Sequence, residues 1–330
     1  MSNTSGRLRA GAIVLTLAGL LASATSPSSA AVRLRGDELK RSWGLEAINA
    51  EAAFRSGLSG RGVKIALVDC GVQGADRELL RNVSRRSKDL LPRRRAAPPE
   101  PHGAYVAAPL AASVNGRGMA GVAHNATLIS IRADFDGGLD GQCAFYPSDL
   151  ARALDYAVDQ KARIIVLPLQ ARNALGQPFE AALERVVKSG AAVVIAAGNR
   201  KGDEPTWPAR YAVDPRYAGS IVVAGASSYY GSLASWSNRA GSVQPWYVAA
   251  PGEWVLTNCR EKCKIVSGTS FSASYVAGAL ALMMEHHAEW TGRQAVDAVL
   301  DATRDAGDPG TDPVYGRGVL DLAAAFPSAD

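Results

Sequence analysis

Several features that mark other classes of protein are missing from this chain of 330 residues. No Gly-x-Gly-x-x-Gly motif opens a helix after the first strand-like run, which argues against a dinucleotide-binding protein. The four cysteines form no Cys-x-x-Cys pair and do not cluster with histidines, which argues against structural zinc. The basic cluster between 85 and 95 has no interleaved aromatic residues. Despite a net charge of +5, we therefore expect a solvated loop there rather than a nucleic-acid site.

Long hydrophobic runs are also absent, and this decides how the N-terminus is interpreted. Arg7 and Arg9 precede an apolar run over 10–22, and small residues around Ala30 follow it. The run is shorter than the roughly 20 apolar residues that a spanning helix needs. The pattern predicts a signal peptide over 1–30, cleaved after Ala30, and the alternative is a retained membrane anchor. We expect no membrane span after cleavage, and export to the periplasm or the extracellular medium.

Export would carry the cysteines into an oxidising compartment, where disulfides form. Cys259 and Cys263 are close in sequence between two strand-like runs, and we expect them to pair with Cα atoms about 4.4 to 6.8 Å apart. Spacing leaves the state of Cys70 and Cys143 open.

Apolar runs alternate with helical patterns along the rest of the chain. The segment 31–57 carries one predicted helix over 42–54, one domain spans 58–325, and 326–330 is a tail. Buried strands are predicted over 63–68, 128–132, 163–169, 191–197 and 221–226. Helices are predicted over 148–161 and 179–189, the second closed by Gly190. This order predicts the α/β class: a mostly parallel, doubly wound sheet with helices on both faces.

Polar residues with chemical potential follow the predicted strands or begin predicted helices. Asp69 directly follows the first strand, and Asn199 follows Gly198 after the fourth. His102 opens an apolar helix through Gly103, whereas the other three histidines lack such a setting. Ser270 opens a second apolar helix, where free N–H groups favour developing negative charge. Each residue alone is explained by a turn, surface or capping role, but together they supply an orienting group, a base, a nucleophile and an oxyanion donor.

With these motifs in order, residues 58–325 resemble the subtilisin family of serine proteases. The similarity runs through GLSGRGVKIALVDCGV, HGAYVA, VVIAAGN and, most specifically, GTSFSASYVAG. It implies a secreted serine endopeptidase in which Ser270 attacks the substrate, His102 transfers the proton and Asp69 orients His102. It also implies that Asn199 donates to the oxyanion. The residues expected to bind substrate are Leu169, Gln170, Ala196, Ala197 and Gly198.

The resemblance also bears on cofactors, partners and backbone geometry. We expect protein or peptide substrates, a monomer and no required metal or organic cofactor; a structural calcium ion is left open because no motif for one is readable. Trp207-Pro208 is expected to be cis. The segments WGLEAINAEAAF and YGRGVLDLAAAF are similar to passenger domains of subtilisin-like autotransporters. Because no translocator follows before Asp330, we expect a free exported protein.

Some positions depart from the family pattern. Ala104 stands where Thr is usual, Cys70 replaces Thr or Ser, and Ser274 replaces Pro. Pro168-Leu169-Gln170 stands where a Ser-Leu-Gly turn binds substrate backbone. These changes leave an alternative, a pseudoenzyme that keeps the fold as a binding module. The geometric expectation is that His102 offers one ring nitrogen to Asp69 and the other to Ser270 Oγ, each near 2.6 to 3.2 Å.

Overall fold

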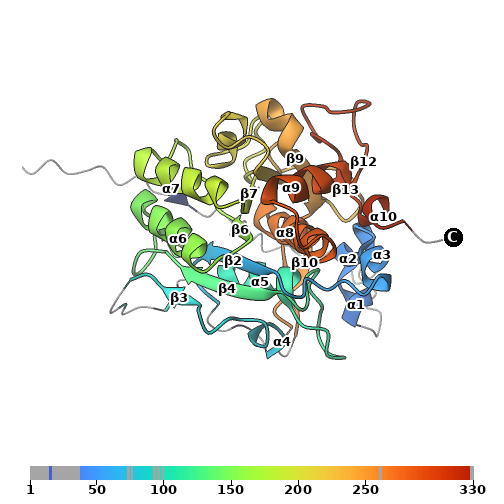
Figure 1. Cartoon of the computed structure of the whole chain (residues 1–330), viewed down its shortest axis with the longest axis horizontal. Coiled ribbons are helices and arrows are strands. Elements are labelled where there is room, and N and C mark those ends of the chain that lie inside the picture. The colour runs from blue at the N-terminus through green and yellow to red at the C-terminus, as the bar shows by residue number, and fades with distance from the viewer. Residues whose placement is uncertain are drawn as a thin grey trace, which may run out of the picture.

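A computed structural model of the chain (Figure 1) describes residues 15–16, 38–72, 75, 77–91, 94, 97–98, 100–259 and 262–327. The predicted signal peptide therefore lies outside the described residues except for β1 (Leu15–Thr16), which pairs antiparallel with β5 (Ala144–Phe145). Within the described residues, no helix is long and apolar enough to cross a membrane.

The centre of the molecule is one sheet of nine strands in the order β12-β13-β9-β8-β7-β6-β2-β4-β3. Every neighbouring pair is parallel except β12 with β13. From that edge, the strands are β12 (Thr303–Arg304), β13 (Val319–Leu320), β9 (Tyr247–Pro251), β8 (Ile221–Ser227), β7 (Ala192–Ala196), β6 (Ile164–Leu167), β2 (Lys64–Asp69), β4 (Thr127–Arg132) and β3 (Lys88–Asp89). The five predicted strands are present within one to two residues of the expected bounds, and the parallel α/β fold is confirmed.

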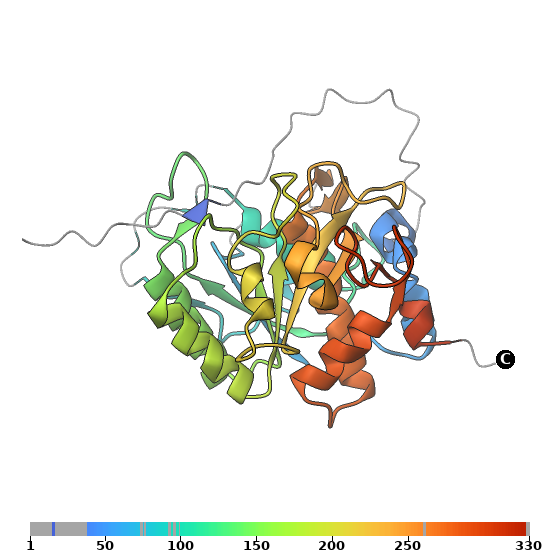
Figure 2. The same ribbon diagram turned by 90° about the horizontal axis from the view of Figure 1, so that it is seen from above.

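Helices cover both faces of this sheet, as Figure 2 shows with the strands between two groups of helices. On one face lie α6 (Pro147–Asp159) and α7 (Gln177–Lys188), and on the other α5 (His102–Ala111), α8 (Thr269–His286) and α9 (Gly292–Asp301). Shorter elements are α1 (Glu38–Arg41), α4 (Arg77–Leu80), the 3₁₀ helices at Ala209–Val213 and Gly241–Trp246, and the hairpin of β10 (Val255–Thr257) and β11 (Lys264–Val266). Gly190 closes α7 at φ 80°, as expected.

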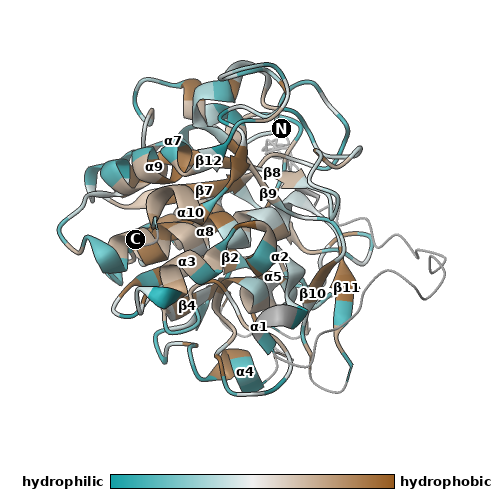
Figure 3. Ribbon diagram, turned by 90° about the vertical axis from the view of Figure 1, so that its right-hand side faces the viewer, coloured by the Kyte–Doolittle hydropathy of each residue, from teal (hydrophilic) through white to brown (hydrophobic). Residues whose placement is uncertain are grey.

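Two apolar cores result, one on each face, because successive strand residues point to opposite sides. In β2, Ile65 and Leu67 join the core on the side of α5 and α8, whereas Ala66 and Val68 join the core on the side of α6. Helix α8 is apolar on all sides and buried through almost its whole length, as expected of a central helix. Figure 3 shows the hydrophobic colours concentrated in the strands and α8, with hydrophilic colours mainly in outer helices and loops.

The prediction of one helix over 42–54 is wrong. The segment forms α2 (Trp43–Ala47) and α3 (Ala50–Arg55), separated at Asn49, which adopts a left-handed conformation with φ 51°. The break lets Ile48, which is fully buried, accept a hydrogen bond at its carbonyl from the N–H of Leu322. That residue starts α10 (Leu322–Ala325), which lies beside α3 (Figure 1). Tertiary contact with the C-terminal helix therefore outweighs the local helical pattern.

Both cysteine pairs form disulfides. Cys259 pairs with Cys263 as expected and closes the β10–β11 hairpin, although the Cα separation of 3.8 Å lies below the expected range. Cys70, whose state the sequence left open, is joined to Cys143 across 73 positions of sequence. The peptide bond between Trp207 and Pro208 is cis, as expected.

Candidate active site

The predicted site residues gather at one rim of the sheet because β2, β6 and β7 are parallel neighbours and end on the same side. Asp69 is the last residue of β2. Gln170 lies three positions beyond β6, and Asn199 lies three positions beyond β7. All three side chains are buried. Helices α5 and α8, which carry His102 and Ser270, begin at this rim.

Asp69 and His102 form a direct pair. Nδ1 of His102 lies 2.8 Å from Oδ2 and 3.1 Å from Oδ1 of Asp69. Gly103 permits this approach, because a Cβ there would collide with the Gly71 carbonyl oxygen and lie 3.1 Å from Oδ1 of Asp69. The first half of the geometric expectation is therefore met: one ring nitrogen of His102 faces the Asp69 carboxylate.

The surroundings of His102 raise the basicity of its imidazole. Burial alone lowers the pKa of His102, but the Asp69 charge, the Asp69 hydrogen bond and the Glu100 charge raise it, and the net pKa is raised. Glu100 is itself a perturbed group, because burial raises the pKa of its carboxyl more than His102 lowers it. A raised imidazole pKa makes His102 a stronger proton acceptor.

Ser270 is the second residue of α8, and the helix cap is Gly268, so Ser270 is not the N-cap residue. One turn further along, Ser274 Oγ donates to the carbonyl of Val106 at 2.7 Å. Val106 lies one turn beyond His102 in α5. This hydrogen bond aligns the two helices so that the first turn of α8 stands beside the first turn of α5. The ring of Phe271 contacts that of His102, with centroids 6.1 Å apart.

The second half of the geometric expectation is wrong for this structure. The Ser270 hydroxyl donates to the Pro168 carbonyl at 3.0 Å, and no hydrogen bond joins it to His102 among the described residues. Pro168 directly follows β6, so the hydroxyl faces the sheet rim. Rotation about the Ser270 χ1 angle moves the oxygen away from this carbonyl, and nucleophile-to-base hydrogen bonds are often formed only with substrate bound.

Asn199 is attached to the start of the same helix. Its side-chain oxygen accepts from Thr269 N at 2.9 Å and from Thr269 Oγ1 at 2.8 Å. Thr269 Oγ1 also accepts from the N–H of Gly198 at 3.1 Å. The amide oxygen faces Thr269, and the amide nitrogen of Asn199 lies beside Gly268, the residue that precedes Thr269. The Asn199 side chain is thus fixed at the first turn of the helix that carries Ser270.

The residues predicted to bind substrate lie next to Asn199, at the ends of β6 and β7, and form a wall along this part of the rim. Leu169, Ala196 and Ala197 are buried, and Gly198 adopts φ 113°, a conformation that side chains rarely accept. Gln170 lies inside the wall rather than projecting into solvent, because its Oε1 accepts from the Asn199 N–H at 3.2 Å. Gln170, which stands where the family usually has Gly, therefore accepts a hydrogen bond from the Asn199 backbone and holds it in place.

A cavity of about 390 Å³ adjoins this wall. Its lining includes Ala171, next to Gln170, and Arg200, next to Asn199. Thr206 also lines the cavity, and its N–H donates a hydrogen bond to the carbonyl of Ala197, a wall residue, at 2.8 Å. The cavity is therefore continuous with the residues that hold Asn199.

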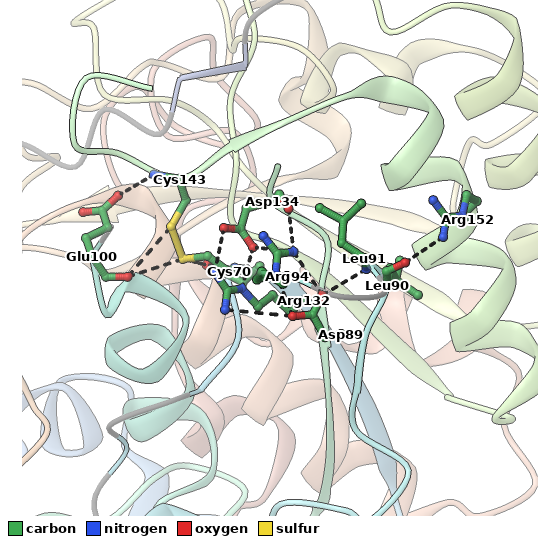
Figure 4. Close-up of polar contacts among 11 residues, drawn as sticks. Cys70, Asp89, Leu90, Leu91, Arg94, Glu100, Arg132, Asp134, Cys143 and Arg152 are labelled. Atoms are coloured by element: carbon green, nitrogen blue, oxygen red, sulfur yellow. Dashed lines mark hydrogen bonds and ion pairs between the residues drawn. A yellow bond between two sulfur atoms is a disulfide. The ribbon is translucent and has the colours of Figure 1, made fainter. Parts of the chain in front are cut away.

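The Cys70–Cys143 disulfide lies next to Asp69 in the sequence and in space, and a largely buried cluster of ion pairs lies near the disulfide (Figure 4). In that cluster, Asp134 pairs with Arg132 at 2.8 Å and with Arg94 at 3.3 Å, and Arg94 pairs with Asp89 at 2.7 Å. Burial raises the pKa of Asp134 in spite of the arginines. Among the described residues, Asp69, Cys70 and Cys143 are the one group close enough to share a metal ion, but the disulfide already joins both sulfurs.

Sequence reasoning missed four contributors to this site: Thr269, Glu100, Val106 and Cys143. The signal for Thr269 was visible, because a hydroxyl residue precedes Ser270 directly. Glu100 and Cys143 meet only through a loop whose path the sequence does not specify, and the Val106 carbonyl belongs to the backbone.

A parallel sheet that brings an Asp–His pair and a serine at a helix start to one rim is the arrangement of a serine peptidase. Comparison with known proteins agrees with this class. The family model described as the subtilase family matches residues 60–318. Subtilisin BL of Lederbergia lenta is 30% identical over 298 residues, covering 86% of this chain and 97% of that protein. The major intracellular serine protease of Bacillus subtilis strain 168 is 29% identical over 252 residues, covering 74% and 76%. The chain belongs to the subtilase family, and it is a serine-type endopeptidase.

Proposed function

We propose that Asp69, His102 and Ser270 are the catalytic triad of an endopeptidase that works through an acyl-enzyme. The observation that carries the proposal is the 2.8 Å contact between His102 and Asp69, combined with the hydrogen bond that aligns α8 with α5. His102 takes the Ser270 proton as the oxygen attacks the scissile carbonyl, and later returns it to the leaving amine. Asp69 fixes the imidazole tautomer through Nδ1 and stabilises the cation. This chemistry uses groups of the chain itself and requires no cofactor.

The oxyanion donors in this proposal are the Asn199 side-chain amide and the Ser270 backbone N–H. The geometry supports it because the amide oxygen of Asn199 is held by Thr269, which directs the amide nitrogen away from that residue. The start of α8 adds free N–H groups and the positive end of the helix dipole. Loss of such an Asn costs on the order of 10² to 10³ in kcat.

The decisive test is Ser270→Ala assayed on unfolded casein and with a serine-directed phosphonate. We expect kcat to fall by about 10⁶, the loss known for the subtilisin nucleophile, and phosphonate labelling to disappear. Ser272→Ala is the matched control, because this hydroxyl lies in the same helix turn, is fully buried and has no hydrogen-bond partner among the described residues. We expect the control to keep its activity. Unchanged casein cleavage by Ser270→Ala would contradict the triad.

We further propose that the chain is exported with cleavage after Ala30. The charged and apolar N-terminal pattern supports this, as do two disulfides, which persist in oxidising compartments. N-terminal sequencing of the mature protein tests it, with Ala31 expected first; a mature protein that still begins near Met1 would contradict cleavage.

A further inference from the structure

The Cys70–Cys143 disulfide lies directly behind the Asp69 carboxylate. Cys70 follows Asp69 in the chain, and its backbone N–H donates to Asp69 Oδ1 at 2.6 Å. Its sulfur lies 3.1 Å from the same oxygen. Both cysteines are fully buried. Any shift of the Cys70 backbone therefore moves a hydrogen-bond donor of the carboxylate that faces His102.

The other side of the crosslink reaches the segment that leads into α5. The N–H of Cys143 donates to Glu100 Oε1 at 3.3 Å. The Glu100 carbonyl oxygen lies 3.6 Å from one sulfur and 3.9 Å from the other (Figure 4). Glu100 precedes His102 by two residues. The disulfide therefore joins the end of β2 to the loop after β4, and the hydrogen bond from Cys143 to Glu100 extends this link to the entry of the His102 helix.

We propose that this disulfide positions Asp69 against His102 and makes the peptidase activity depend on the oxidation of Cys70 and Cys143. The inference rests on the proposed triad. A dithiol reductant would break the sulfur–sulfur bond, give two thiols and itself become a disulfide, with two electrons and two protons transferred. The loop would then be released from β2, and a thiol S–H beside Oδ1 would compete with His102 for that oxygen. The enzyme would have low activity in a reducing cytoplasm and gain activity after export.

The test compares Cys70→Ala/Cys143→Ala with Cys259→Ala/Cys263→Ala, which removes the hairpin disulfide as a matched control. In the first variant we expect kcat to fall at least tenfold, with KM changed less than about twofold. We also expect the acid limb of kcat/KM to move to lower pH, because a poorly held Asp69 raises the pKa of His102 less. The control should keep the kcat and pH profile of the oxidised enzyme.

A purely structural role is distinguished by measuring folding together with activity. Wild-type protein is reduced with a phosphine while near-ultraviolet circular dichroism and kcat are followed. Loss of kcat with a native spectrum supports the proposal, whereas loss of both in parallel, or unchanged kcat and pH profile without the disulfide, overturns it. Oxidised wild type and Ser270→Ala, assayed alongside, report independently on the proposed triad.

A separate observation concerns the cavity beside Asn199. Three arginines are among its lining residues: Arg172, Arg200 and Arg210. The two carboxylates in the lining already have partners: Asp203 pairs with Arg239 at 2.8 Å, and Glu204 accepts from Ser242 N and Oγ. Among the described residues, neither Arg172 nor Arg200 has a carboxylate partner, and Arg210 donates from Nε to a backbone carbonyl.

We infer that this cavity binds an acidic side chain of the substrate, on the residue that supplies the scissile carbonyl. Arg200 directly follows Asn199, the proposed donor to that carbonyl's oxygen, so the side chain of the same substrate residue lies nearest the cavity. Guanidinium groups bind carboxylates in a two-pronged geometry, which favours Glu or Asp. This inference also rests on the proposed function.

Matched peptides that differ only by Glu or Gln before the cleaved bond test this specificity. We expect wild type to prefer Glu by at least tenfold in kcat/KM, and Arg172→Gln/Arg200→Gln to lose most of that preference. Rising salt should reduce the preference in wild type. Equal or faster cleavage of the Gln peptide overturns the inference. Ser270-dependent cleavage of casein in the same preparation keeps the proposed function separate from this result.

Discussion

At the residue scale, the reactivity of His102 depends on two carboxylates rather than one. Asp69 bonds to its ring, whereas Glu100 acts on it through charge alone. Both raise the pKa of an imidazole that burial would otherwise keep neutral. In the proposed mechanism His102 must be neutral to accept the Ser270 proton, so we expect a raised pKa of His102 to confine activity to higher pH.

Glu100→Gln separates the charge of Glu100 from its structural role. The amide oxygen can still accept from the Cys143 N–H, but the charge that raises the pKa of His102 is gone. We expect the acid limb of kcat/KM to shift to lower pH by less than about one unit, with kcat on the plateau retained. The measurement is a pH–rate profile. Glu51→Gln, at an exposed carboxylate of α3, is the control and should shift nothing; a shift of the Glu100→Gln limb to higher pH would contradict the argument.

At the scale of elements, α8 must lie close to its neighbours to hold Ser270 beside α5. Gly278 lies two turns beyond Ser270, and a Cβ there would collide with the side chain of Val122. An Ala at this helix position would by itself gain about 0.5 to 1 kcal/mol in conformational entropy. Overpacking in a fixed core costs about 1 to 3 kcal/mol, and Val122 is fully buried. We therefore expect the cost of the collision to exceed the entropic gain.

Gly278→Ala is therefore expected to lower the free energy of unfolding by about 1 to 2 kcal/mol, with a lower Tm. Chemical denaturation measures the first quantity and thermal melting the second. Val122→Ala serves as the partner in a double-mutant cycle: the double variant should lose less than the sum of the single losses, because the smaller side chain makes room. Strict additivity would show that the two positions do not compete for space.

The elements that sequence patterns predicted well are those in which local pattern and burial agree. β2 and β7 are apolar runs buried on both sides, and α7 is a periodic helix with one buried face. The prediction of one helix over 42–54 failed because contacts with α10, which lies far along the chain, determine the conformation at Ile48 and Asn49. β9 was not predicted as a strand, although its YVAAP segment is fully buried, because five residues with two alanines and a proline give little β signal.

At the scale of the whole molecule, the sheet brings together residues that are far apart in sequence. His102 and Ser270 are 168 positions apart, but their helices begin at the same rim of the sheet. Parallel strands send their carboxyl ends to one rim, and α8 crosses the sheet on the face opposite α6 and α7. The N-terminal helices and α10 then pack into the same core as α8, through Leu45, Ile48 and Leu322. Helices α2, α3 and α10 thus share a core with α8, which carries Ser270, the proposed nucleophile.

The sequence by itself determined the class of fold and the positions of five buried strands, and it was enough to propose Asp69, His102, Asn199 and Ser270 as site residues. These follow from local patterns: apolar runs, glycines at turns, and polar residues at strand ends. Only the tertiary structure decided that Cys70 pairs with Cys143, that Glu100 acts on His102, and that the Ser270 hydroxyl faces Pro168. Each of these depends on where a loop or a backbone carbonyl comes to lie once distant segments pack. Local propensity does not encode such positions, because they are set by the sum of many long-range contacts.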